Sequence, residues 1–122
     1  MQKDLKHIIK LPPQEVELEK AILGAMLLER DGLVLGIAEI QHTEVFYMEQ
    51  HQVIFNAIKD LFSTAKPIDI LTVVVQLRSK GQLEIAGGSF YVTELTTLVN
   101  SSANIQYHIQ IVKQKWVQRL II

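Results

Sequence analysis

The sequence predicts an all-α fold, with a compact helical head of about five to six helices followed by one further helix. Apolar residues recur at the three- and four-residue spacings of amphipathic helices, and no segment alternates as a strand does. Caps and breakers separate these helical segments. Hydrophobic residues make up 48% of the chain and charged residues only 20%, below the usual charged share of about 25%. We therefore expect apolar surface to remain exposed.

The first ten residues are expected to form a flexible arm, because the breaker Leu11-Pro12-Pro13 follows them. The first helix is expected over about residues 14–29. Glu15, Glu17 and Glu19 lie near its amino end, where the helix dipole favours carboxylates. Its apolar residues spread around most of the circumference, so this helix should lie at the centre of the fold.

Two further helices are expected before residue 66. Residues 31–40 can form a helix capped by Asp31, although Gly36 costs about 1 kcal/mol relative to alanine in a helix interior. Residues 49–65 show the spacing of one wide apolar face. That face consists of Val53, Ile54, Ala57, Ile58, Leu61 and Phe62.

The clearest helix begins at Asp69. Pro67 cannot lie inside a helix, and the Asp69 carboxylate can accept from the free amides of the first turn. Ile68 and Val73 occupy the two positions of a hydrophobic staple. Gly81 can adopt the left-handed conformation that ends a helix.

Another amphipathic helix follows this one after a short connection. Residues 82–88 are expected to turn the chain, and Gly87-Gly88 opens the next helix. Tyr91, Leu95 and Leu98 fall on one stripe of that helix. The two helices are therefore expected to form a pair.

The last helix is expected from about Ala103 to the end of the chain, after a loop at residues 100–102. It carries two apolar stripes on nearly opposite sides. One consists of Ile105, Ile109, Val112, Trp116 and Leu120, and the other of Tyr107, Ile111, Ile121 and Ile122. One core cannot easily cover both stripes. Because neither glycine nor proline ends this helix, we expect the chain to be cut inside a longer helix.

No enzymatic activity or cofactor is expected for these residues. None of the six glycines is followed by lysine, so the chain lacks a phosphate-binding loop. The histidines lack metal-ligand spacing, and cysteine is absent. We interpret His51 as a packed or hydrogen-bonding histidine, and the glutamates at positions 15, 17 and 19 as a dipole-matched helix start. Trp116 fits a core and an interface equally well.

Charge and hydropathy restrict the partners and the compartment. Residues 11–100 carry six bases and twelve acids, a balance that repels nucleic acid. The longest apolar run, Ala21–Leu28, is far shorter than the ~20 residues of a membrane span. Glutamates and prolines precede that run where a signal peptide would be basic. The expected localisation is cytoplasmic.

Several blocks of sequence also match a known family in order and spacing. They include Leu11-Pro12-Pro13, Phe46-Tyr47, His51, Ile54-Phe55, Pro67-Ile68-Asp69, Gly87-Gly88, Tyr91 and Ala103-Asn104-Ile105. From Leu11 onward the chain resembles the N-terminal domain of the bacterial replicative DNA helicase, the DnaB family. Glu15, Leu18 and Val74-Val75 depart from the family pattern, and residues 32–45 match it poorly. These departures affect local surface chemistry and not the fold.

The resemblance implies a division of the chain and a set of partners. Residues 11–100 would form the helical head, and residues 101–122 the first helix of a truncated helical hairpin. The ATP-driven motor, with its ATP, Mg²⁺ and most DNA contacts, would lie in an absent C-terminal domain. The domain would be a non-catalytic collar that forms dimers within a hexamer and binds the helicase-binding domain of primase and a helicase loader.

The candidate interface lies on the last helix. Its residues are Ile105, Tyr107, Ile109, Ile111, Val112, Trp116, Leu120 and Ile121. The sequence leaves open which stripe packs on the head and which meets a partner.

Two rival interpretations concern binding proteins. The helicase-binding domain of primase resembles this fold, but the Leu11-Pro12-Pro13 and Pro67-Ile68-Asp69 blocks favour the helicase. A helical nucleic-acid-binding module would use the basic strip of Lys113, Lys115 and Arg119.

Overall fold

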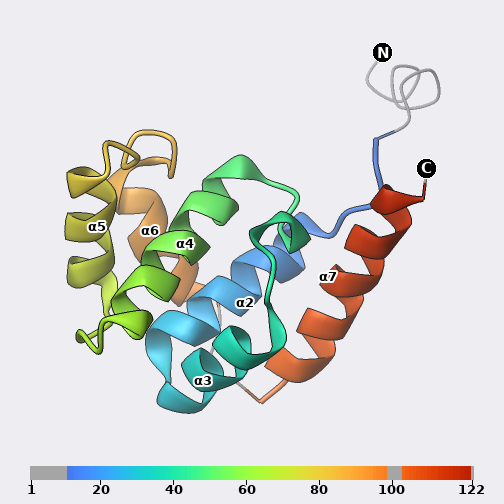
Figure 1. The fold of residues 1–122 in the computed structure, drawn as a ribbon, viewed down its shortest axis with the longest axis horizontal. Coiled ribbons are helices and arrows are strands. Elements are labelled where there is room, and N and C mark those ends of the chain that lie inside the picture. The colour runs from blue at the N-terminus through green and yellow to red at the C-terminus, as the bar shows by residue number, and fades with distance from the viewer. Residues whose placement is uncertain (1–10, 99–102, 122) are drawn as a thin grey trace.

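The structure is a computed structural model that describes residues 11–98 and 103–121 (Figure 1). Its helices are α2 (Val16–Leu28), α3 (Arg30–Glu39), the 3-10 helix η1 (Thr43–Val45), α4 (Glu49–Ser63), α5 (Ile70–Ser79), α6 (Gly88–Thr97) and α7 (Ile105–Leu120). No strand occurs within the described ranges, which confirms the all-α prediction. Among these same residues, no helix is long and apolar enough to cross a membrane.

Helix α2 lies at the centre of the fold, as its all-round apolar pattern predicted. It packs against α3, α4, α6 and α7. In Figure 1, α4, α5 and α6 lie to one side of α2, and α7 lies to the other. Ile22, Leu23 and Met26 of α2 are almost completely buried. One continuous hydrophobic core therefore includes side chains from each of the helices α2 to α7.

The α2 and α3 helices approach closely at Gly36. A Cβ atom at this position would lie 2.6 Å from the sulfur of Met26. Glycine lowers the stability of the helix at this position, but its missing side chain allows Met26 to pack closely against α3. The predicted cap of α3 was wrong, because α3 begins at Arg30 with Glu29 as its N-cap, and Asp31 lies in its first turn.

The predicted helix over residues 49–65 is confirmed as α4, which ends two residues earlier. Five residues of the predicted face are buried, namely Val53, Ile54, Ala57, Ile58 and Leu61. Phe62 is only partly buried, and the buried Phe55 was not predicted. The sequence did not predict η1, which connects α3 to α4 and contacts α7. This connection brings residues 43–48 close to the amino end of α2.

The caps of α5 agree with the prediction. The Asp69 carboxylate accepts from the Thr72 amide at 2.8 Å, and the Thr72 hydroxyl accepts from the Asp69 amide at 2.9 Å. Gly81 has a φ of +70°, the left-handed conformation expected after the helix. Both ends of α5 are therefore set by local sequence.

Helix α6 begins where the glycine pair predicted, and Gly87 has a φ of +96°. Its predicted apolar stripe needs a correction. Val92 and Leu95 are buried, Tyr91 is partly buried, and Leu98 is exposed. Leu98 is the C-cap of α6 and is 53% exposed, so the apolar spacing continues one residue beyond the helix without burial.

Helix α7 belongs to the same core as the preceding helices. It packs against α2, α3 and η1 through Ile105, Ile109 and Val112. Helix α7 therefore shares the core of the preceding helices, and the division of the chain at residue 100 stays a prediction. The expected arm at residues 1–10, the loop at residues 100–102 and Ile122 lie outside the described residues.

Candidate interaction surface

Within residues 11–98 and 103–121, no group of three or more histidine, cysteine or acidic side chains is placed to hold a metal ion. The buried polar or charged side chains of the described core are Glu19 and His51. Any candidate chemistry in the interior therefore involves this pair. The remaining functional features are on the surface.

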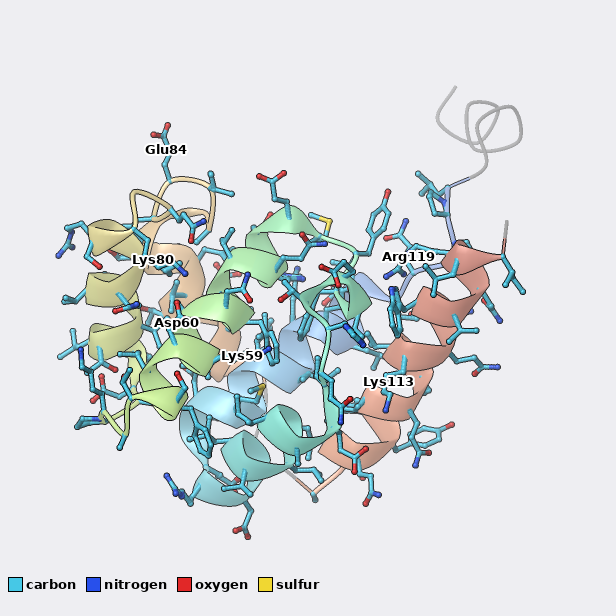
Figure 2. The ribbon with its side chains drawn as sticks, viewed as in Figure 1. Lys59, Asp60, Lys80, Glu84, Lys113 and Arg119 are labelled. Atoms are coloured by element: carbon cyan, nitrogen blue, oxygen red, sulfur yellow. The ribbon has the colours of Figure 1, made fainter. Side chains whose placement is uncertain are left out.

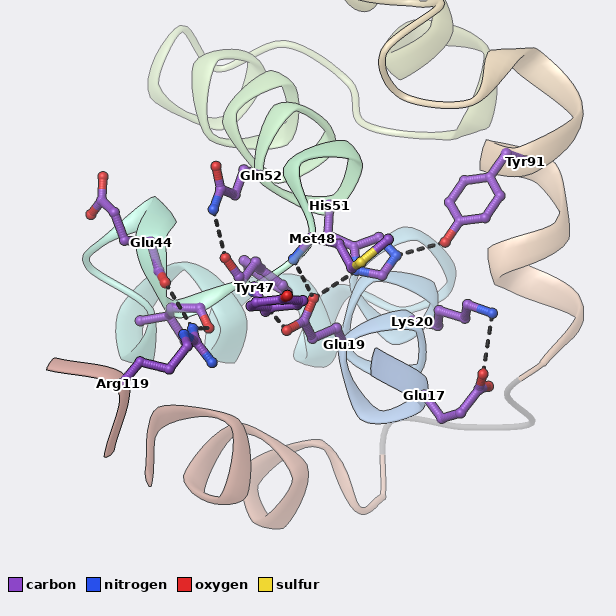
Figure 3. Close-up of polar contacts among 12 residues, drawn as sticks. Glu17, Glu19, Lys20, Glu44, Tyr47, Met48, His51, Gln52, Tyr91 and Arg119 are labelled. Carbon is purple, nitrogen blue, oxygen red and sulfur yellow. Dashed lines mark hydrogen bonds and ion pairs between the residues drawn. The ribbon is translucent and has the colours of Figure 1, made fainter. Parts of the chain in front are cut away.

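Glu19 and His51 form a hydrogen-bonded network with Tyr91 that joins α2, α4 and α6 (Figure 3). His51 Nδ1 lies 2.8 Å from Glu19 Oε1, and His51 Nε2 lies 2.6 Å from the Tyr91 hydroxyl. Glu19 also accepts from the backbone amides of Tyr47 and Met48, at 2.7 and 3.4 Å. Glu19 thus caps the amino end of α4, where a carboxylate complements the helix dipole.

A neutral His51 with its proton on Nδ1 satisfies this network. The Nδ1–H group donates to Glu19, and Nε2 accepts from the Tyr91 hydroxyl. Burial of Tyr91, together with the negative charges of Glu17, Glu94 and Glu19, raises the pKa of Tyr91 to about 12. The Tyr91 hydroxyl therefore keeps the proton that it donates.

This network is structural, because its side-chain donors and acceptors bind one another and the amino end of α4. The interpretation of His51 as a hydrogen-bonding histidine is confirmed. The inward role of Glu19 was missed, since the sequence assigned all three glutamates to the helix dipole. The signal was present, because Glu19 precedes Ile22, Leu23 and Met26 at the three-, four- and seven-residue spacings of the apolar stripe.

The structure decides which stripe of α7 packs on the head. Ile105, Ile109 and Val112 are almost completely buried against this chain's own core. Their inclusion in the candidate interface is therefore corrected, because another chain cannot reach them in the folded domain. Trp116 also faces inward, where it packs against the core and lies 5.4 Å from the His42 ring.

Arg119 fixes the carboxyl end of α7 to two other segments. Its guanidinium donates to the carbonyl oxygens of Pro13, Glu44 and Val45 at 2.8 to 3.1 Å. It also lies over the Tyr47 ring, 5.4 Å from the ring centre. Figure 3 shows Arg119 directed toward Glu44. This cation therefore holds the end of α7 against the segment before α2 and against η1.

The opposite side of α7 is an apolar surface without a neighbour among the described residues, which we call the outer α7 face. It comprises Tyr107, Ile111, Val117 and Ile121. Leu120 lies at helical spacing from Trp116 on the inner stripe, but it is also exposed, close to the carboxyl end of α7. Tyr107 and Leu120 are each 65% exposed, and Ile121 is 79% exposed. Ile111 is partly exposed. Helical spacing aligns Tyr107, Ile111, Gln114, Gln118 and Ile121, so no charge interrupts this stripe.

The family described as DnaB-like helicase N terminal domain matches residues 11–114. The chain belongs to this DnaB-like family. The replicative DNA helicase DnaB of Rhodothermus marinus is 47% identical over 112 residues, which are 92% of this chain and 12% of that protein. The DnaB of Geobacillus stearothermophilus is 40% identical over 113 residues, 93% of this chain and 25% of that protein.

The DnaB-like chain therefore spans a quarter or less of the length of these two relatives. Its fold also matches a solved structure, the crystal structure of the N-terminal domain of DnaB helicase from Mycobacterium tuberculosis. The TM-score is 0.85 at 34% sequence identity, over 89% of this chain and 75% of that one. The resemblance and the all-α fold predicted from the sequence are both confirmed.

Proposed function

We propose that this chain is the non-catalytic N-terminal domain of a replicative DNA helicase, and that it serves helicase assembly and primase docking in DNA replication. The family membership and the helicase relatives support the replicative role. The outer α7 face carries the proposal of assembly, because it exposes large apolar side chains along a complete helix. Contiguous exposed apolar surface of this kind is typical of protein–protein contacts.

The outer α7 face suits a contact between two copies of the domain. A two-fold interface uses the same surface on both partners, so an uncharged stripe avoids opposing like charges. Tyr107 supplies an aromatic side chain, the type that is enriched in interface centres. The face also lies at one end of the molecule's long axis, away from α5 and α6 (Figure 1). Two copies can therefore meet there without obstructing those helices.

The basic residues of α7 give little support to the rival nucleic-acid-binding function. Lys113 Nζ lies 3.8 Å from Glu39 Oε2, and the Arg119 guanidinium donates hydrogen bonds to backbone carbonyls (Figure 2). Only Lys115 of the three predicted basic residues has no such partner among the described residues. A single cation of this kind neutralises too little phosphate charge for binding at physiological salt.

Self-association tests the assembly part of the proposal. We expect light scattering and sedimentation to detect dimers of this chain between micromolar and millimolar concentration. Ile121→Glu and Tyr107→Glu should each raise the dissociation constant about tenfold or more, because each inserts an unpaired charge into the apolar contact. Leu71→Glu is the matched control, since Leu71 is 76% exposed on α5. A strict monomer at millimolar concentration would refute assembly through this face.

Calorimetry tests the primase part separately. The C-terminal helicase-binding domain of the matching primase, titrated into this chain, is expected to bind with measurable heat. A DNA duplex of equal concentration at physiological salt is expected to give none, because the domain is acidic overall. Heat from the duplex and none from the primase domain would contradict primase docking and favour the nucleic-acid-binding rival.

A further inference from the structure

A second apolar surface lies on α5, at the other end of the molecule from α7 (Figure 1). It is a groove of about 330 Å³ between α5 and the connection from α4, which we call the α5 groove. Leu61, Lys66, Pro67, Leu71, Val75 and Gln76 contribute to its lining. Leu71 is 76% exposed and Val75 57% exposed, so the apolar wall is open to solvent.

The α5 groove has a fixed shape. Val73, Val74 and Leu77 anchor the inner side of α5 in the core. The Asp69 capping box fixes the first turn of the helix. The Lys66 amide donates to the Leu61 carbonyl at 3.0 Å, which closes the end of α4. A partner would therefore meet a preformed surface, and preformed surfaces lower the entropic cost of binding.

Charge around the α5 groove differs from that of the rest of the domain. Residues 59–80 carry four bases and two acids, whereas the other residues between 11 and 98 carry two bases and ten acids. Both acids near the groove are engaged, because Asp60 pairs with Lys80 at 2.7 Å (Figure 2) and Asp69 caps α5. Lys59, Lys66 and Arg78 remain to set the local charge, and Lys66 is the one that lines the groove. The groove is thus apolar with a basic margin on an otherwise acidic body.

The positions of these side chains follow one stripe of α5. Leu71, Val75 and Arg78 are spaced by four and three residues, so they lie along the same side of the helix. Lys66 lines the groove near the amino end of α5, and Arg78 lies near the carboxyl end. A ligand lying along the helix would meet a cation, two apolar side chains and a second cation.

We propose that the α5 groove binds an acidic amphipathic helix of a partner protein. Such a helix offers apolar residues at matching intervals and carboxylates for Lys66 and Arg78. Addition of a strand is disfavoured, because the described residues present no sheet edge. The α7 helix of a second copy is a poor ligand, since residues 103–121 contain Lys113, Lys115 and Arg119 and no acid. This surface is separate from the outer α7 face and does not depend on the proposed function.

Two short fluorescent peptides test the α5 groove. Both are designed helices with leucines on one face, and the flanking positions are glutamate in one and lysine in the other. The glutamate peptide should bind the full chain, and its affinity should fall with added salt because exposed ion pairs are screened. Amide resonances of Leu71, Thr72 and Val75 should shift in its presence. The lysine peptide should bind at least about tenfold more weakly, because like charges oppose each other.

Matched variants distinguish specific binding in the α5 groove from nonspecific binding to the chain. Leu71→Glu should lower the affinity for the glutamate peptide about tenfold or more, whereas Leu120→Glu on α7 should leave this affinity unchanged. Lys66→Glu should lower the affinity for the glutamate peptide severalfold. Lys115→Glu makes the same charge change on α7 and should leave this affinity unchanged. Equal binding of both peptides, or equal loss in groove and α7 variants, would overturn the proposal. Shifts at Leu71 and Val75 that depend on chain concentration without peptide would overturn it in favour of self-association.

Discussion

Replacing Glu19 by alanine is expected to lower the free energy of unfolding by about 3–4 kcal/mol, the largest effect of a single polar substitution in this domain. The carboxylate is buried and accepts from the Tyr47 and Met48 amides and from His51. Alanine would leave these donors without a partner in a site that water does not reach. Urea denaturation followed by circular dichroism measures the loss.

Glu17 provides the matched control for this experiment. It lies in the same first turn of α2, but its side chain is 78% exposed and pairs with Lys20. Glu17→Ala should therefore change the free energy of unfolding by less than about 0.5 kcal/mol. Glu19→Gln keeps one acceptor oxygen, so its effect should lie between the two. Equal losses for Glu17→Ala and Glu19→Ala would show that Glu19 acts only through the helix dipole.

Ile109→Ala is expected to cost about 3 kcal/mol of unfolding free energy, because it opens a cavity in the core between α7 and the centre of the fold. Ile109 is 1% exposed. Ile111 lies two residues later on the other side of the same helix and is only partly buried. Ile111→Ala should cost less than about 1 kcal/mol, since its side chain loses few neighbours.

The two alanine variants are also expected to affect self-association differently. Ile111→Ala should weaken the proposed dimer, and Ile109→Ala should do so only where it unfolds the chain. Denaturation curves combined with sedimentation separate the two effects. A larger loss of unfolding free energy for Ile111→Ala than for Ile109→Ala would show that the Ile111 side of α7 faces the core.

Local physics made most of the fold predictable from the sequence. The ends of α5 follow from Asp69 and Gly81, whose side-chain and backbone properties act within a few residues. The wide apolar faces of α2 and α4 likewise predicted their burial. The errors occurred where several residues can serve the same local role, as with Asp31 and Glu29 before α3. At the end of α6, the apolar spacing continues to Leu98, but this C-cap residue is exposed.

Long-range polar contacts could not be predicted in the same way. Glu19 and His51 are 32 residues apart, and only folding places their side chains at 2.8 Å. Arg119 reaches Pro13, which lies 106 residues earlier in the chain. Glu19 falls at the spacing of the apolar residues of α2, a signal that was missed, and no local signal shows that Glu19 and His51 would satisfy each other. Pairing depends on the relative placement of α2 and α4, which no local signal contains.

Local patterns in the sequence predict the helical class and most helix positions, and ordered blocks of residues indicate the DnaB-like family. Which face of α7 packs on the core follows only from the tertiary structure. Both stripes of this helix are apolar, so amphipathic periodicity does not distinguish them. Packing against α2 and α3 buries Ile105, Ile109 and Val112 of one stripe, while Leu120 at the end of that stripe stays exposed. The exposed stripe is the one that a partner can reach, because a hydrophobic side chain stabilises an interface only where its own core has not already covered it.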